Sequence, residues 1–237
     1  MRTLKLLGFL LTYPTEDHIR NLNECQQILK NEKWLSSKSI KRLEGFLQEM
    51  KRTDLLDLQE GYVALFDRTP SLSLHLFEHV HGDSRDRGQA LADLSELFQN
   101  VGLSIQMAET PDYLPIFLEF CSIQSQEDAK ENLNTIINIL SALKKRLENR
   151  QSKYAIIFDA IIETVSRKPD ARAVEQAIRQ ASGAAYSNAQ VDREWEEQFA
   201  FENNGLDNNG EAGCPRADEL VARFSEYHDT KSERITK

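Results

Sequence analysis

Apolar residues recur at helical spacing along most of this chain, and that periodicity limits the fold more than any other feature. Two clear stripes are Leu133, Ile136, Ile137, Leu140, Leu143 and Leu147, and Leu91, Leu94, Leu97, Phe98 and Val101. Residues three and four apart share one face of a helix, so each stripe predicts an amphipathic helix. Alternating strand patterns are scarce. The sequence therefore predicts an all-α fold.

Helix start signals divide this periodic pattern into separate elements. Hydroxyl residues stand directly before helical segments at Thr15, Ser36, Thr53 and Ser125. Such residues cap helix N-termini because their side-chain oxygen accepts a free backbone N–H. We expect about nine or ten helices, with a long central pair at roughly 126–149 and 151–167.

The loops between these helices are short and no repeat is evident, which predicts one compact helical domain over residues 1–200. Residues 192–213 differ, with seven acidic residues and one basic residue among many glycines and asparagines. This composition buries too little apolar surface to offset the entropy of ordering. We expect an acidic, largely flexible tail over 201–237, in which the segment ADELVARFSEYH can form a terminal helix.

Charge and cysteine content restrict the class of partner. Lys and Arg number 29 against 38 Asp and Glu, a net charge of −9, which disfavours nucleic acid and anionic membranes and favours a basic partner segment. Cys25, Cys121 and Cys214 show no C-x-x-C spacing, as expected of reduced thiols in the cytoplasm. The apolar run near the N-terminus is short and lacks a cleavage site, so we expect neither a secretory signal nor stable membrane insertion.

Residues 74–88 crowd charged and histidine side chains between hydrophobic segments. Phe77 can anchor this run to a core, and Ser84 is placed to cap the next helix. The polar members cannot all be buried without partners, so some must face a cleft, a partner or water. These candidate partner-binding residues are Glu78, His79, His81, Asp83, Arg85 and Arg87.

Three interpretations of this run remain open. His79 and His81 can bind a metal with Glu78 or Asp83, they can cap helices and pair with carboxylates, or they can contact a partner. The arginines at 85 and 87 match phosphate oxygens of a cofactor, and they equally suit internal ion pairs. The three cysteines are scattered, and we predict that the protein holds no metal.

A second candidate region spans residues 112–120, DYLPIFLEF. Asp112 and Glu119 lie seven residues apart, which predicts one face of one helix, with Asp112 as its N-cap and Pro115 in the first turn. Glu119 is expected on the solvent face or in a groove that attracts positive charge. No nucleophile, P-loop, G-x-G-x-x-G or G-x-S-x-G motif accompanies these carboxylates, so we predict no enzyme activity.

Five segments together resemble the NarJ-type chaperones, the delta subunits of respiratory nitrate reductase. The most specific is LFEHVHGDSRDRGQA at 76–90, supported by YVALFD at 62–67, DYLPIFLEF at 112–120, LLTYP at 10–14 and DREWEEQFAF near Asp192. This chain has Tyr113 where the family pattern usually has histidine, which keeps an aromatic face with a polar tip. The resemblance covers roughly residues 5–200.

The resemblance implies a system-specific chaperone rather than a metal-dependent enzyme or a structural subunit. Such proteins bind the catalytic molybdenum subunit of nitrate reductase, including its N-terminal segment, and keep it competent for cofactor insertion before membrane docking. They hold no permanent cofactor and assist insertion of the molybdenum cofactor into the client, so the cofactor-delivery machinery is a second expected partner. A TorD- or DmsD-like chaperone for another molybdoenzyme with a twin-arginine signal is the alternative.

Overall fold

The computed structural model describes residues 1–80, 85–103, 109–165 and 167–183, and these form ten α-helices with no β-strand. The first five helices are α1 (Arg2–Phe9), α2 (Glu16–Glu32), α3 (Ser37–Arg52), α4 (Leu55–Tyr62) and α5 (Arg85–Asn100). The others are α6 (Leu114–Ile123), α7 (Gln126–Thr135), α8 (Ile137–Asn149), α9 (Ala155–Glu163) and α10 (Ala171–Gly183). The all-α prediction is confirmed.

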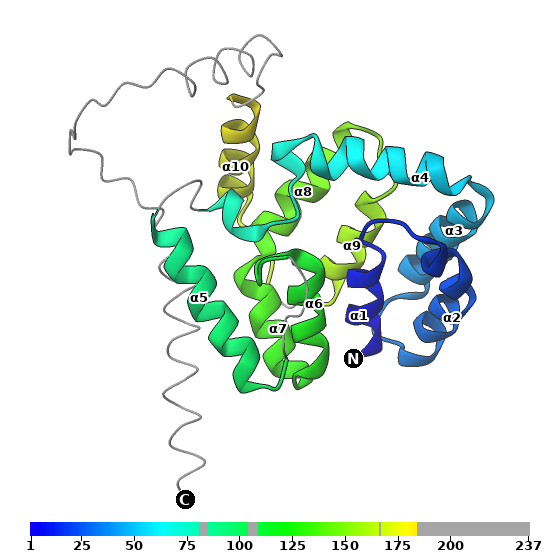
Figure 1. Ribbon diagram of the computed structural model, residues 1–237, viewed down its shortest axis with the longest axis horizontal. Coiled ribbons are helices and arrows are strands. Elements are labelled where there is room, and N and C mark those ends of the chain that lie inside the picture. The colour runs from blue at the N-terminus through cyan, green and yellow to red at the C-terminus, as the bar shows by residue number, and fades with distance from the viewer. Residues whose placement is uncertain (81–84, 104–108, 166, 184–237) are drawn as a thin grey trace, which may run out of the picture.

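Helix α1 lies at the centre of the arrangement, with α2 and α3 on one side and α6, α7 and α5 on the other (Figure 1). It contacts α2, α6 and α9. A Cβ atom at Gly8 would lie 3.0 Å from the Pro115 carbonyl oxygen and 3.3 Å from the Leu118 Cβ. Helices α1 and α6 therefore approach closely because residue 8 has no side chain.

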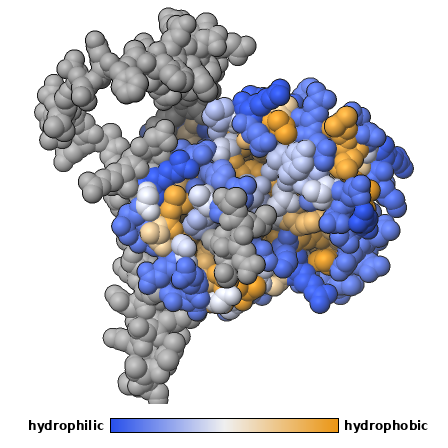
Figure 2. All heavy atoms as spheres, in the orientation of Figure 1, coloured by the Kyte–Doolittle hydropathy of each residue, from blue (hydrophilic) through white to orange (hydrophobic). Residues whose placement is uncertain are grey.

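Both predicted apolar stripes face the core. Every residue of the 133–147 stripe is buried, and Phe98 of α5 stacks on Phe120 of α6 with ring centroids 4.5 Å apart. Hydrophilic residues cover most of the visible surface, with smaller hydrophobic areas between them (Figure 2). Arg146 of α8 links the segment around Ser71 to α10, because its guanidinium donates to the carbonyls of Ser71 (2.5 Å) and Ala177 (2.7 Å).

Three of the four predicted helix starts are confirmed: α2 follows Thr15, α3 follows Ser36 and α7 follows Ser125. The fourth is wrong by one residue. Asp54 caps α4 by accepting the Leu56 N–H at 2.9 Å, because the hydroxyl of Thr53 instead donates to the Glu49 carbonyl at the end of α3. The predicted cap at Ser84 lies outside the described residues.

The long helix expected at 126–149 is two helices. Ile136 separates α7 from α8, with φ −102° and ψ 7°, and the Thr135 hydroxyl donates to the Asn132 carbonyl at 2.6 Å. Three consecutive β-branched residues at 135–137 crowd a helix, which favours a break there. The second predicted helix, 151–167, is shorter and corresponds to α9, Ala155–Glu163.

Three short turns connect α4 to α5. A π-helical turn, η1 (Val63–Asp67), extends α4 and closes with the Arg68 N–H donating to the Val63 carbonyl at 2.9 Å. Two 3-10 turns follow, η2 (Pro70–Leu72) and η3 (Leu76–His79). Within the described ranges no helix is long and apolar enough to cross a membrane. The predicted tail, 201–237, lies beyond them.

Candidate functional site

Two segments far apart in sequence pair side by side at the entrance to α6. The Leu76 N–H donates to the Asp112 carbonyl (3.0 Å) and the Leu114 N–H donates to the Leu74 carbonyl (2.8 Å). His75 and Tyr113 face each other across this antiparallel bridge, with ring centroids 5.2 Å apart. The pairing places the start of the 74–88 run against the DYLP segment.

The carboxylate of Asp112 holds this pairing together from inside. It is 0% exposed and accepts the Phe77 N–H at 3.0 Å and the Thr110 hydroxyl, with His75 Nδ1 at 3.5 Å. Burial alone raises the pKa of the Asp112 carboxyl, but the hydrogen bonds from His75, Thr110 and Phe77 outweigh it and hold that pKa below its usual value. Asp112 is therefore an ionised, fully bonded group.

His75 is the side chain that can carry the matching positive charge. Thr110 gives its single hydroxyl proton to Asp112, so His75 Nδ1–H is shared between the Thr110 oxygen at 3.0 Å and the Asp112 carboxylate at 3.5 Å. Nε2 lies 3.6 Å from the Glu109 carboxylate. The hydrogen bond to Asp112 raises the pKa of His75, although burial opposes it. We call His75, Thr110 and Asp112 the clasp.

Three tyrosines lie next to the clasp. The buried Tyr62 hydroxyl donates to the Leu11 carbonyl at 3.0 Å, so the Tyr113 hydroxyl, 3.0 Å away, donates to the Tyr62 oxygen. Burial raises the pKa of both phenols. Tyr13 stands edge-on to Tyr62 with centroids 5.7 Å apart and remains 44% exposed.

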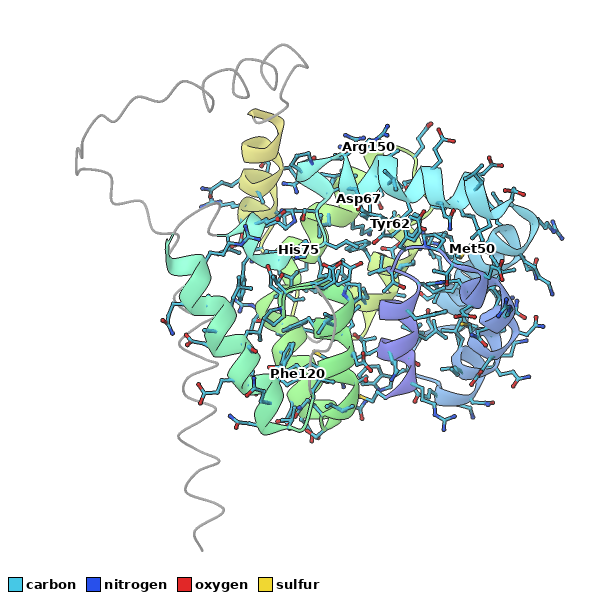
Figure 3. The ribbon with its side chains drawn as sticks, in the orientation of Figure 1. Met50, Tyr62, Asp67, His75, Phe120 and Arg150 are labelled. Atoms are coloured by element: carbon cyan, nitrogen blue, oxygen red, sulfur yellow. The ribbon has the colours of Figure 1, made fainter. Side chains whose placement is uncertain are left out.

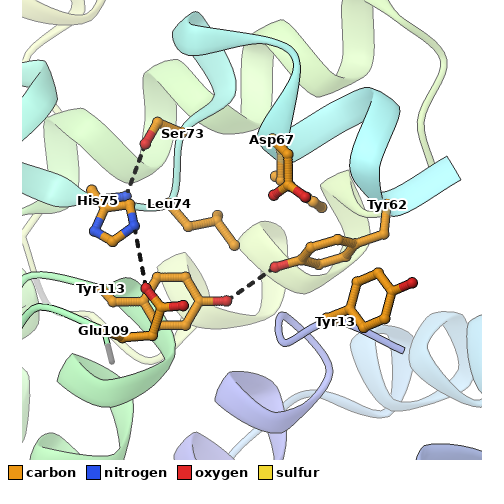
Figure 4. A pocket seen from close by; sticks show the side chains of 9 residues that line it. Tyr13, Tyr62, Asp67, Ser73, Leu74, His75, Glu109 and Tyr113 are labelled. Atoms are coloured by element: carbon orange, nitrogen blue, oxygen red, sulfur yellow. Dashed lines mark hydrogen bonds and ion pairs between the residues drawn. The ribbon is translucent and has the colours of Figure 1, made fainter. Parts of the chain in front are cut away.

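These groups enclose a pocket of about 250 Å³, open to solvent on one side (Figure 4). Its lining consists of Tyr13, Tyr62, Phe66, Asp67, Ser73, Leu74, His75, Glu109 and Tyr113. Figure 3 shows Tyr62, Asp67 and His75 near one another, above α1 and α6 and apart from Phe120. The π-helical turn supplies Phe66 to the floor, while Asp67 is exposed.

The predicted residues of the 74–88 run have different partners. Phe77 is buried, Glu78 pairs with Arg87 at 3.3 Å, and His79 Nε2 donates to the Ser73 carbonyl at 2.8 Å. Burial lowers the pKa of His79, so its imidazole is neutral and structural. His81, Asp83 and the side chain of Arg85 lie outside what the structure describes.

The predictions for Asp112 and Glu119 were wrong about the helix. Helix α6 begins at Leu114 after Tyr113, so Asp112 precedes it and does not cap it. The carboxylate instead caps the turn at Phe77, whose buried N–H donates to it at 3.0 Å. Glu119 lies on α6, 41% exposed, in an ion pair with Lys5 at 2.7 Å.

A family model, the nitrate reductase delta subunit, matches residues 35–159 of the chain. The chain belongs to the nitrate reductase delta subunit family. The molybdenum cofactor assembly chaperone NarJ of Escherichia coli (strain K12) is 36% identical over 198 residues, 84% of both chains. The probable chaperone NarW of that strain is 35% identical, covering 84% of this chain and 82% of its own length. The probable NarJ of Bacillus subtilis (strain 168) is 25% identical over 75% of this chain and 95% of the relative.

Three of the five segments that carry the resemblance to this delta subunit family meet in the pocket. Tyr13 comes from LLTYP, Tyr62, Phe66 and Asp67 come from YVALFD, and Tyr113 comes from DYLP. Leu74 and His75 come from the chain directly before LFEHVH. The pocket thus joins three segments that are far apart in the sequence, and it lies directly before the fourth, LFEHVH.

Sequence reasoning missed His75 and Glu109. The alternation Leu74-His75-Leu76 carried a usable signal, because an extended segment with both leucines buried must turn the intervening side chain the other way. Within the described part of the chain, no group of three or more His, Cys, Asp or Glu side chains is arranged to hold a metal ion. Cys25 and Cys121 are buried free thiols.

Proposed function

We propose that this protein is a system-specific chaperone for a respiratory nitrate reductase. It binds the catalytic molybdenum subunit in the cytoplasm, including the N-terminal segment, and keeps that subunit competent for molybdenum cofactor insertion before membrane docking. The observation that carries this function is the match to assembly chaperones over 84% of both chains. The cofactor is cargo for the client, and the protein itself keeps none.

The pocket supports a binding role rather than a catalytic one. The side chains of Asp112, His75 and Tyr62 make hydrogen bonds to other groups of the protein. These bonds fix the shape of the site. A catalytic acid or base needs an atom that can reach a substrate. We therefore assign the protein no enzyme activity and treat these three residues as the frame of a client-binding surface.

We assign the remaining predicted residues according to where each lies. Phe77, His79 and Asp112 shape the site from inside, whereas Tyr113 lines the pocket. Glu119 and the Glu78–Arg87 pair lie at the surface, where a charged client segment can compete for them. His81, Asp83 and Arg85 stay predicted client contacts.

The TorD- or DmsD-like alternative is not favoured, because the similar chaperones are named for nitrate reductase.

Affinity purification of the full chain from cells grown anaerobically on nitrate tests this function. Mass spectrometry is expected to find the catalytic molybdenum subunit as the main partner. Calorimetry should show that a synthetic peptide of that subunit's N-terminus binds, and more weakly as salt screens the charges. A scrambled peptide is the control. A wild-type protein that recovers no catalytic subunit and ignores the peptide at every salt concentration contradicts the proposal.

A further inference from the structure

We propose that the pocket between Tyr13, Tyr62, Asp67, Glu109 and Tyr113 accepts the guanidinium group of a client arginine. The inference rests on the proposed chaperone function and deepens it, because it names the chemical group that the site selects. It is carried by an unpaired carboxylate, by aromatic walls and by the size of the pocket.

The carboxylate of Asp67 supplies the charge. It is exposed beside the pocket and makes no hydrogen bond or ion pair with any other described residue. Glu109 lies beside the opposite wall, 42% exposed, with His75 Nε2 3.6 Å from its carboxylate (Figure 4). Glu109 already has His75 as a close neighbour, whereas Asp67 has no such partner among the described residues, so Asp67 is the main acceptor for an incoming cation.

The tyrosines supply faces on which a flat cation can stack. Tyr62 and Tyr113 are held by their shared hydrogen bond, and Tyr13 stands at right angles to Tyr62, with an interplanar angle of 88°. A guanidinium attracts aromatic faces and is weakly hydrated, so it leaves water for such a wall more readily than an ammonium does. Its flat fork also matches a carboxylate in two parallel hydrogen bonds.

The volume and the charge exclude other classes of ligand. A pocket of about 250 Å³ holds several times the roughly 30 Å³ of one liquid water, which suits a side-chain head group. Two carboxylates repel anions. A divalent metal needs more ligands than the described residues gather at any one point. An organic cation that fills the space, meets the carboxylates and stacks on the tyrosines fits this lining best.

Titration of the ¹⁵N-labelled full chain with N-acetyl-arginine amide tests the assignment. The resonances of Tyr13, Asp67 and Tyr113 should shift together with a millimolar dissociation constant. Asp67→Asn should weaken binding about tenfold, as expected when one close ionic contact is lost. The matched control is Asp57→Asn, an exposed carboxylate in the first turn of α4 that does not line the pocket, and it should leave binding unchanged.

Two further probes separate guanidinium recognition from general attraction of cations. N-acetyl-citrulline amide has the same shape without the charge, and N-acetyl-lysine amide has the charge without the plane, so both should bind at least fivefold more weakly. Equal binding of the lysine probe overturns the assignment. So does unchanged binding by Asp67→Asn, or shifts that cluster away from the pocket.

The outcomes also distinguish this inference from the chaperone function. Protein that binds the client peptide but not the arginine probe overturns the pocket assignment and leaves the chaperone role intact. Protein that binds the arginine probe at the pocket but recovers no catalytic subunit supports the assignment and overturns the proposed function.

Discussion

Two histidines lie at turns of this protein, and their surroundings shift their pKa values in opposite directions. At the turn between α1 and α2, His18 is buried and stacked on Phe9, with ring centroids 4.0 Å apart. Its Nδ1 accepts the Thr15 N–H at 3.1 Å and its Nε2 contacts the Phe9 carbonyl at 3.0 Å. Burial lowers the pKa of His18, so the ring is neutral there. In the clasp, the hydrogen bond to Asp112 raises the pKa of His75.

The difference between these two turns comes from one buried carboxylate. Around His18 the hydrogen-bonding partners are the Phe9 carbonyl, the hydroxyls of Thr12 and Thr15 and the Thr15 N–H, and none of these is a carboxylate. Around His75, the Asp112 carboxylate offsets the free-energy cost of protonating a partly buried imidazole. The turn at His18 joins α1 to α2, whereas the turn at His75 contributes to the lining of the pocket.

The largest effect is expected from removing that carboxylate. Asp112→Ala leaves the Phe77 N–H, the Thr110 hydroxyl and His75 without their shared acceptor, so the free energy of unfolding should fall by about 3 kcal/mol. Urea unfolding measures it. Asp57→Ala, an exposed carboxylate, is the control and should change stability by less than about 0.5 kcal/mol. Equal effects of the two substitutions would show that the clasp stabilises nothing.

A smaller loss is expected at the neutral turn. His18→Ala removes a cap and an aromatic stack, worth together about 2 kcal/mol, while the Tyr113 resonances of the pocket should stay in place. Thr15→Ser keeps the capping oxygen and serves as the matched control. If His18→Ala also shifted Tyr113, the two turns would not be independent.

The smallest effect is a dependence of stability on pH with opposite signs at the two histidines. The raised pKa of His75 adds stability below its unfolded value of 6.5, and this is lost as the pH rises through the folded pKa. The lowered pKa of His18 removes stability as the pH falls below 6.5, because the unfolded chain takes up the proton.

Unfolding of two variants between pH 5.5 and 8 separates these contributions. The stability deficit of His75→Gln relative to wild type should shrink as the pH rises, and that of His18→Gln should shrink as the pH falls. NMR titration of the ring protons should place the midpoint of His75 above 6.5 and that of His18 below it. Two deficits with the same slope would contradict the assigned charge states.

Most of the fold followed from the sequence because helical periodicity is a local signal. The stripe at 133–147 correctly predicted a buried face, but it continues in phase across the break at Ile136, so periodicity could not reveal two helices. Capping was also local. Thr53 failed as a predicted cap because its hydroxyl had a nearer acceptor in Glu49, a choice that only the backbone path decides.

The site was less predictable because its residues are far apart in the sequence and become neighbours only in the folded chain. The motifs around Tyr62 and Asp112 were recognised separately, yet nothing local indicates that Asp112 reaches back 35 positions to the Phe77 N–H. A carboxylate two residues before a helix looks like its cap from sequence alone. His75 was hidden for the same reason, since its role depends on a partner that the chain supplies much later.

The close approach of α1 to α6 also has a consequence for biosynthesis. The Lys5–Glu119 pair spans 114 positions, and the pocket forms where the turn after α1 meets the start of α6. At about 5–20 residues per second, α1 leaves the ribosome roughly 6–23 s before its partner helix. Until then its buried face, with Leu4 and Leu7, has no α6 to cover it. The lining of the pocket is therefore incomplete until Tyr113, close to the middle of the 237-residue chain, has been made.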